Sequence, residues 1–262
     1  MIYSIKTDHF ECKYIESEID HPILCESHCH AKYEMIAVAD GDVTVMSEGQ
    51  KYRLQKNQII ILPPLLYHSV TANEEGSYRR ITVLFSLDAI PRVLQDEFAN
   101  RESCTAIDAA HIERIKEICR SGDSEFYAPL IQGLMTEILY DAVRIPQAPA
   151  KIETDEFLRK AFEYIDRHLH EKILLDDLAH YTSRSKSSFC HLFLEKMNIS
   201  PKQYILQKKL ALASKLIGDG IPPTSAAVQV GYENYSNFYR IYMKHFGSSP
   251  GGVIAAHSAS KP

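Results

Sequence analysis

The 262-residue sequence contains no tryptophan, and no apolar run approaches the ~18 residues that a membrane-spanning helix requires. The longest apolar candidate, residues 58–66, is interrupted by a Pro-Pro pair and is typical of a β-strand. The N-terminus also lacks the basic head and the apolar core of a secretory signal. We therefore expect a cytoplasmic protein that makes no membrane contact.

Paired cysteines are missing as well. None of the six cysteines lies at the C-x-x-C spacing of a metal or redox motif. They are Cys12, Cys25, Cys29, Cys104, Cys119 and Cys190. Scattered cysteines of this kind are typical of free thiols in a reducing compartment. The sequence therefore predicts neither a disulfide framework nor a cysteine-ligated zinc.

The charge is unevenly distributed along the chain, although the net charge is only −5. Residues 1–150 hold 14 Lys and Arg against 23 Asp and Glu, whereas residues 151–262 hold 15 against 11. From Tyr181 onward there are 10 basic and 3 acidic residues. This pattern indicates that only the C-terminal part meets a polyanion.

The hydrophobic periodicity changes once along the chain. Short strands with turn signals between them occupy about residues 25–87, which is typical of a barrel or sandwich. Two amphipathic helices follow, around residues 112–119 and 130–142, and the Pro-containing segment 145–151 is typical of a linker. The fold class expected is α+β with two domains: a β-barrel with a helical pair in 1–145, a linker in 146–152, and an all-α domain in 153–262.

The C-terminal part repeats one pattern, in residues 178–201 and again in 226–250. Each copy has a short helix with a small residue inside, a tight turn, and a longer helix with aromatic residues four apart. Small residues let two helices cross closely, as in a helix-turn-helix unit. One such helix alone is more often an ordinary amphipathic surface helix, so the duplication with its matching prolines carries the prediction.

Helical spacing places the aromatic residues of each longer helix inward and leaves the other side chains for DNA. Outward Asn and Arg side chains suit base edges in the major groove, and basic residues near the turn suit phosphates. The candidate DNA-binding residues are Arg184, Lys186, Ser187, Cys190, His191, Ser236, Asn237 and Arg240. We assign Arg184 and Lys186 to phosphates, and Asn237 and Arg240 to bases.

Residues 157–250 resemble the AraC/XylS family of transcription regulators. The matching segments are Leu178-Ala179, Ser185-x3-Phe189-x3-Phe193, Ser200-Pro201-x2-Tyr204, Leu210-x2-Ala213-x2-Leu216 and Gly231-Tyr-x-Asn-x-Ser-x-Phe238-x-Arg240-x-Tyr242. The resemblance implies two DNA-reading helices joined by one rigid helix, residues 201–217. Lys209 and His191 stand where the family usually has Arg, and Gly-Gly-Val-Ile after Pro250 replaces its aromatic-Arg pair. We therefore expect the second unit to read more sequence than the first.

The N-terminal part carries His28-x-His30-x3-Glu34-x6-Gly41 and, later, Asn57-x5-Pro63-x4-His68. These spacings resemble the two motifs of cupin barrels, with glycines missing at Asn57 and Leu65. The resemblance implies a sensor barrel whose effector pocket is formed by His28, His30, Tyr33, Glu34 and His68. In metal-bearing cupins the ligands would be His28, His30, Glu34 and His68. Since regulator cupins often keep such residues without metal, we expect an organic effector and no metal or cofactor.

These features together predict a non-enzymatic, effector-responsive transcription regulator. Its expected partners are double-stranded DNA with promoter half-sites and a small-molecule effector, with RNA polymerase as a further candidate. The helical pair within residues 108–145 would form a homodimer. The alternative is a metal-dependent cupin enzyme, a dioxygenase or isomerase, with a helical appendage. A DNA-repair methyl acceptor would need a cysteine in a zinc-like cluster, which the sequence lacks.

Overall fold

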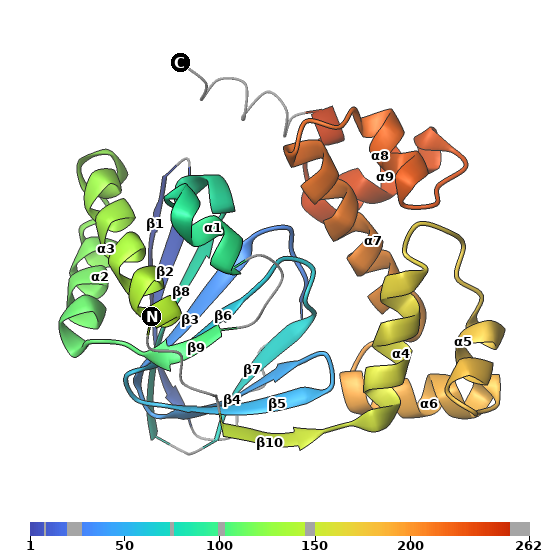
Figure 1. Cartoon of the computed structure of the whole chain (residues 1–262), viewed down its shortest axis with the longest axis horizontal. Helices are drawn as coiled ribbons and strands as arrows, with labels where there is room; N and C mark the ends of the chain where they lie inside the picture. Colours follow the sequence, from blue (N-terminus) through green and yellow to red (C-terminus); the bar gives the residue numbers. More distant parts are fainter. Residues whose placement is uncertain (8, 20–27, 74–75, 99–102, 145–149, 252–262) are drawn as a thin grey trace. The chain divides into compact units, whose positions relative to one another are not determined.

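The computed structural model describes residues 1–7, 9–19, 28–73, 76–98, 103–144 and 150–251. The chain forms two compact units: one contains residues 1–26 and 32–154, and the other contains residues 27–31 and 155–262. We call them the β domain and the helical domain (Figure 1). Among the residues described, no helix is long and apolar enough to cross a membrane.

The β domain contains two antiparallel sheets (Figure 1). The six-stranded sheet has the order β1 (Ile2–Lys6), β2 (Phe10–Ile19), β8 (Gly76–Phe85), β3 (Tyr33–Asp40), β6 (Gln58–Leu62) and β9 (Ser103–Ala106). The four-stranded sheet has the order β10 (Ala150–Thr154), β5 (Gln50–Gln55), β4 (Asp42–Ser47) and β7 (His68–Ala72). Successive side chains of a strand point to opposite faces, so each strand of the larger sheet can serve two cores.

The two cores can be followed along β3, where every residue from Tyr33 to Val38 is buried. Ile36 and Val38 pack with the four-stranded sheet, in a core between the two sheets. Met35 and Ala37 pack on the opposite face, in a second core with the helices. Those helices are η1 (Leu87–Ala89), α1 (Arg92–Phe98), α2 (Ala109–Ser121) and α3 (Ser124–Arg144). The interior between the sheets is therefore lined by alternate residues only.

The expected strands within 25–87 and the expected helical pair are confirmed. The structure adds β1, β2, β9 and β10, which lie outside the range where the sequence pattern is clear. In β1 only Ile5 is fully buried, so the strand lacks a strong hydrophobic alternation. The last three residues of the expected linker, 150–152, belong to β10, which pairs with β5; residues 145–149 lie outside the described ranges.

The helical domain contains α4 (Glu156–Arg167), α5 (Leu175–Tyr181), α6 (Lys186–Met197), α7 (Pro201–Gly218), α8 (Pro223–Gln229) and α9 (Tyr235–Phe246). Helix α7 serves both halves of the domain. Near its start, the Tyr204 ring contacts Phe162 and Phe193 at centroid distances of 5.0 and 5.5 Å. Farther along, Leu210 and Ala213 belong to the core that contains Phe238 and Tyr242. One rigid helix thus carries both helix-turn-helix units.

Candidate functional site

The turns α5–α6 and α8–α9 have the same hydrogen bonds. In the first turn the amide of Arg184 donates to the Ala179 carbonyl, and in the second the amide of Tyr232 donates to the Ala227 carbonyl. One residue earlier, the amides of Ser183 and Gly231 donate to the carbonyls three residues back. Ser183 and Gly231 both have positive φ, 56° and 78°. This is the Schellman helix ending, and it turns both units in the same way.

Helix α6 begins at a Ser185 cap, whose hydroxyl accepts from the amide of Ser188. Phe189 and Phe193 are fully buried, as the helical spacing predicts. On the opposite face Ser187 and His191 are exposed, whereas Cys190 is only half-buried. The outward face of α6 therefore exposes the His191 imidazole and the Ser187 hydroxyl, and the Cys190 thiol beside them is half-buried.

Helix α9 begins at an Asn234 cap and buries Phe238 and Tyr242. Ser236, Asn237 and Arg240 are all exposed on its other face. The Arg240 guanidinium donates to the side-chain oxygen of Asn237 over 3.1 Å. The Asn-Arg pair is therefore presented together, with donors of both side chains left for base edges.

The two basic residues expected at phosphates are exposed, and both have a contact on the protein surface. The Arg184 guanidinium lies 5.7 Å from the ring centroid of Phe157. The Lys186 ammonium lies 2.7 Å from a carboxylate oxygen of Asp176, and this hydrogen bond raises the pKa of Lys186. A phosphate at Lys186 would have to compete with Asp176 for the ammonium group.

Two lysines counted in the positive charge of the C-terminal part point inward instead. Lys208 is 2% exposed and its ammonium lies 2.8 Å from a carboxylate oxygen of Asp166 on α4. Lys209 is 8% exposed and donates to the carbonyls of Glu171 and Val230 over 2.6 and 2.7 Å. Burial lowers the pKa of Lys209. Sequence composition alone could not show that these two charges are used inside the domain.

Lys209 connects three parts of the helical domain. It lies on α7, its acceptor Glu171 follows α4, and its other acceptor Val230 is the residue that ends α8. A cation is favoured at the carbonyls of a helix C-terminus. A Cβ on the neighbouring Gly231 would lie 2.9 Å from the Lys209 ammonium and 3.0 Å from the Glu171 carbonyl group. The glycine of the second turn is therefore required by both its positive φ and this close approach.

In the β domain, Glu34 and His68 face each other between the two sheets. Glu34 shares the inward face of β3 with Ile36, and His68 shares the inward face of β7 with Val70. Glu34 is 5% exposed and His68 is 1% exposed. The Nε2 atom of His68 lies 2.8 Å from Oε2 of Glu34. A pair of ionisable side chains is thus buried between the two sheets.

The orientation of the His68 ring is fixed by the turn that precedes β7. Its Nδ1 lies 2.9 Å from the Leu66 carbonyl oxygen, which can only accept, so Nδ1 carries the proton. Leu65 in this turn has φ of 70°, and Asn57 before β6 has φ of 62°. These are the two positions where the cupin motif has glycine. A leucine there is strained by about 1–3 kcal/mol, a cost that is typical of functional segments.

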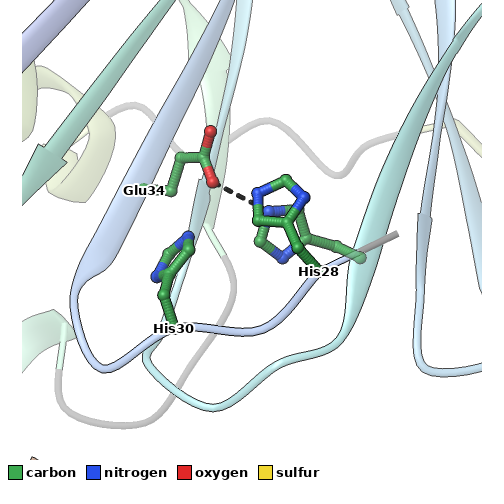
Figure 2. A group of neighbouring side chains, drawn as sticks. His28, His30 and Glu34 are labelled. Atoms are coloured by element: carbon green, nitrogen blue, oxygen red, sulfur yellow. Dashed lines mark hydrogen bonds and ion pairs between the residues drawn. The ribbon is translucent and has the colours of Figure 1, made fainter. Parts of the chain in front are cut away.

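His28 and His30 complete a group of four side chains with Glu34 and His68. Figure 2 labels His28, His30 and Glu34 of this group. One ligand atom from each residue can be chosen such that all four lie within 4.8 Å of one another. The rings of His28 and His30 lie 5.5 Å apart. His28 is exposed and His30 is half-buried, in contrast to the other two. The sequence spacing predicts these four side chains as parts of one site, and we call the group the four-residue cluster.

Tyr33, the fifth residue of the expected effector pocket, is not brought to this cluster. Its neighbour Glu34 points between the sheets, so Tyr33 points to the other face of β3. There its hydroxyl donates to the Phe98 carbonyl over 3.0 Å, and its ring stacks on Phe85 at 5.5 Å. Strand alternation places Tyr33 in the core under the helices rather than in a pocket with Glu34.

Comparison with known protein families gives two matches. The AraC-like ligand binding domain family matches residues 18–139, and the helix-turn-helix domain family matches residues 178–255. The first match extends from the end of β2 into α3, and the second extends from α5 past the end of α9.

Individual relatives have regulator names. The HTH-type transcriptional regulator YdiP of Escherichia coli is 30% identical over 234 residues, which cover 83% of this chain and 76% of that protein. The probable transcriptional regulator LumQ of Photobacterium leiognathi is 36% identical over 88 residues, only 33% of this chain and 36% of its own length. Among solved structures, ToxT of Vibrio cholerae O395 aligns over 96% of this chain and 99% of its own, with 11% identity and a TM-score of 0.43. A likeness this low says nothing of ligands or residue roles.

The repeated turns, the exposed reading faces and these relatives agree with one another. The chain belongs to the AraC/XylS family of transcription regulators, with an N-terminal ligand-binding domain and a C-terminal domain of two DNA-binding helix-turn-helix units.

Proposed function

We propose that this regulator reads two adjacent DNA half-sites, one with α6 and one with α9, and acts on chromosomal DNA in the cytoplasm. The observation that carries the proposal is the pair of Schellman turns with equivalent hydrogen bonds, one in each helix-turn-helix unit. Each turn is followed by a helix with an exposed polar face, and both units pack on α7. Half-sites read this way lie about 10–10.5 base pairs apart. Reading both from one face requires a bent duplex or weak engagement of one helix.

Within this function, Asn237 and Arg240 contact base edges and contribute most of the specificity for the DNA sequence. Ser187, Cys190, His191 and Ser236 form the rest of the two reading faces, and Arg184 and Lys186 contact phosphates. The β domain senses rather than catalyses: an effector at the four-residue cluster changes the fraction of molecules competent to bind DNA. Recruitment of RNA polymerase would couple this binding to transcription.

The test is selection of binding sites by the full-length protein from a pool of random duplexes. We expect enrichment of a two-part motif whose halves are about one helical turn apart. Competition with unselected DNA at fixed salt then gives the ratio of specific to non-specific affinity, which for such proteins is about 10³ or more. Enrichment of no motif, or equal affinity for selected and unselected DNA, would contradict the proposal.

We further propose that two chains associate through α2 and α3, the helices within residues 108–145. Their inner faces pack on the sheet, but Phe126 is 73% exposed and Tyr140 is 48% exposed on α3. Pairing would raise the avidity for duplicated sites. Analytical ultracentrifugation should show a dimer, and Phe126→Glu should shift it toward monomer. A wild-type monomer at all concentrations would refute the association.

A further inference from the structure

A groove lies between α2 and the six-stranded sheet, on the face of the sheet that the helices cover (Figure 1). Its volume is about 400 Å³, within the usual range of small-molecule sites. We call it the α2 groove. Its charged lining residues are the bases Lys56, Arg79, Lys116 and Arg120 and the acids Glu16, Asp40 and Glu113.

We propose that the α2 groove binds a small organic anion that carries hydroxyl groups, of the sugar-phosphate or sugar-acid class. The site is separate from the four-residue cluster. Ala39 of the groove packs on the helix-covered face of β3, whereas Glu34 lies between the two sheets. All lining residues belong to the β domain, so the proposal does not depend on how the helical domain reads DNA.

The register of the strands places a row of charges on the floor of the groove. Arg79 on β8 is paired with Glu16 on β2 and with Asp40 on β3. A register shift between Val38 and Asp40 brings Asp40 opposite Arg79, and such bulges redirect a side chain. The Arg79 guanidinium lies 3.3 Å from a carboxylate oxygen of Asp40 and 3.7 Å from one of Glu16. One arginine is therefore fixed between two acids.

A second arginine, Arg120 on α2, is oriented by aromatic rings. Its guanidinium carbon lies 5.2 Å from the ring centroid of Tyr3 and 5.5 Å from that of Tyr14. Its Nη2 donates to Glu16 over 3.0 Å. A side chain that is already ordered loses little entropy when it binds a ligand.

Both arginines keep hydrogen-bond donors for a ligand. A guanidinium has five N–H groups, and within the described part of the chain Arg79 and Arg120 each donate one hydrogen bond, to Asp40 and to Glu16. Their side chains are 45% and 43% exposed, so solutes can reach them. The two guanidiniums can therefore bind a carboxylate or a phosphate group.

The mixture of charges defines the rest of the ligand. Arginine and lysine only donate hydrogen bonds, and carboxylates only accept them. A ligand that fits both needs an oxyanion for the bases and donors for the acids. The four bases exceed the three acids by one charge, which favours a ligand with net negative charge. Hydroxyl groups supply donors without positive charge, so a hydroxylated anion fits better than a zwitterion.

A network that only holds α2 on the sheet would not need all of these groups. Among the ion pairs of the described groove residues, only Arg120 with Glu16 joins the helix to the sheet. Lys56 pairs with Asp40 on the sheet side over 3.6 Å, and Lys116 pairs with Glu113 on its own helix. Bases from both walls thus line one groove although they do not hold the walls together.

The binding test uses the full-length protein at fixed ionic strength with four separate probes: glucose 6-phosphate, gluconate, glucose and inorganic phosphate. Calorimetry gives the affinity, and thermal unfolding gives the stabilisation by each probe. We expect glucose 6-phosphate or gluconate to bind with a Kd of about 1 mM or tighter. The tighter of the two identifies the oxyanion. Inorganic phosphate should bind more weakly, and glucose should not bind.

The location of the site is tested with three variants. Arg79→Gln should weaken binding of the tighter probe by at least about 10-fold, because it removes charge-assisted hydrogen bonds. Lys116→Gln, which breaks no contact between α2 and the sheet, should also weaken it. The matched control is Arg114→Gln, the same change on α2 outside the groove, which should alter the affinity by less than about 2-fold. Thermal unfolding without probe verifies that each variant is folded, and Lys116→Gln decides if Arg79→Gln does not fold.

Three results would overturn the inference. The first is no binding of either hydroxylated anion. The second is equal binding of glucose or of inorganic phosphate, which would show that the site does not require both an oxyanion and hydroxyl groups. The third is unchanged affinity in folded Arg79→Gln and Lys116→Gln, which would place the ligand outside the α2 groove.

Discussion

The two helix-turn-helix units repeat the same backbone turn with different side chains. The residue with positive φ is Ser183 in the α5–α6 turn and Gly231 in the α8–α9 turn, and the helix-ending hydrogen bonds around both are equivalent. The outward side chains differ: α6 presents His191 beside a half-buried Cys190, whereas α9 presents the hydrogen-bonded Asn237–Arg240 pair. Turn geometry and DNA reading are thus encoded by separate residues.

The units also differ in how they are held to the rest of the domain. At the second turn, the buried Lys209 ammonium donates a hydrogen bond to the Val230 carbonyl. Only a glycine fits at the next position, residue 231. Ser183, at the equivalent place in the first turn, is exposed. The position of the second unit is therefore set by a buried polar contact, and we expect the second unit to be the more sensitive of the two to substitution at its turn.

The largest effect should come from Gly231→Ala. An alanine with φ of 78° would have a strained backbone, and its Cβ would lie 2.9 Å from the Lys209 ammonium nitrogen. We expect a loss of about 3 kcal/mol or more in the free energy of unfolding, measured with urea. The matched control is Ser183→Gly in the first turn, which should change stability by less than about 1 kcal/mol. Equal stability of Gly231→Ala and wild type would show that the Lys209 contact does not constrain the second unit.

Next in size is the difference between Arg240→Ala and His191→Ala in DNA affinity. A good direct base contact contributes about 1–3 kcal/mol, which corresponds to a loss of roughly 5- to 150-fold on removal. We expect this loss for Arg240→Ala and a smaller one for His191→Ala, at the same salt concentration and on the selected site. A larger loss for His191→Ala would reverse the assignment of the main reading helix.

The helix caps should contribute about equally in the two units. Ser185 accepts from the Ser188 amide over 3.3 Å, and Asn234 accepts from the Asn237 amide over 3.0 Å. Replacement of either cap by Ala should cost about 1 kcal/mol of stability. Thermal unfolding measures the loss. If Asn234→Ala does not change the stability, the Asn234 cap does not stabilise α9.

The smallest effect should come from modification of Cys190. Burial raises the pKa of Cys119 to about 11 and raises the pKa of Cys12 as well, so these two thiols stay protonated and unreactive at neutral pH. We expect Cys190 to react with a maleimide much faster than either, and the label to lower DNA affinity only a few-fold.

The same label introduced through Ser236→Cys in a Cys190→Ser background should lower the affinity more, because it would stand on α9 beside Asn237. Mass spectrometry identifies the modified residue. Equal losses from the two labels would indicate that both helices engage the DNA to the same degree.

Much of this molecule could be predicted from its sequence because the relevant signals are local. Helical spacing predicted the buried faces of α6 and α9. The missing glycines at Asn57 and Leu65 marked positions where the structure has positive φ. The spacing of His28, His30, Glu34 and His68 grouped four side chains whose ligand atoms lie within 4.8 Å of one another.

The contacts that the sequence did not reveal depend on the tertiary fold. Tyr33 was expected in one pocket with Glu34, but strand alternation directs the two side chains to opposite faces of β3. A count of charged residues cannot distinguish Lys209 from a lysine on the surface. Its burial follows from the packing of α7 against the second turn. Strand β10 is recognised as a strand only through its pairing with β5.

The most direct test of DNA binding by this helical domain measures how the affinity of the full-length protein for DNA changes with salt concentration. The measurement is made on the selected site and on unselected DNA. If about six phosphates are neutralised, affinity for both should fall by roughly 10³-fold between about 50 and 200 mM salt, while the preference for the selected site persists. A nearly flat salt dependence, or a preference that vanishes, would contradict the assignment of α6 and α9 as paired readers of DNA.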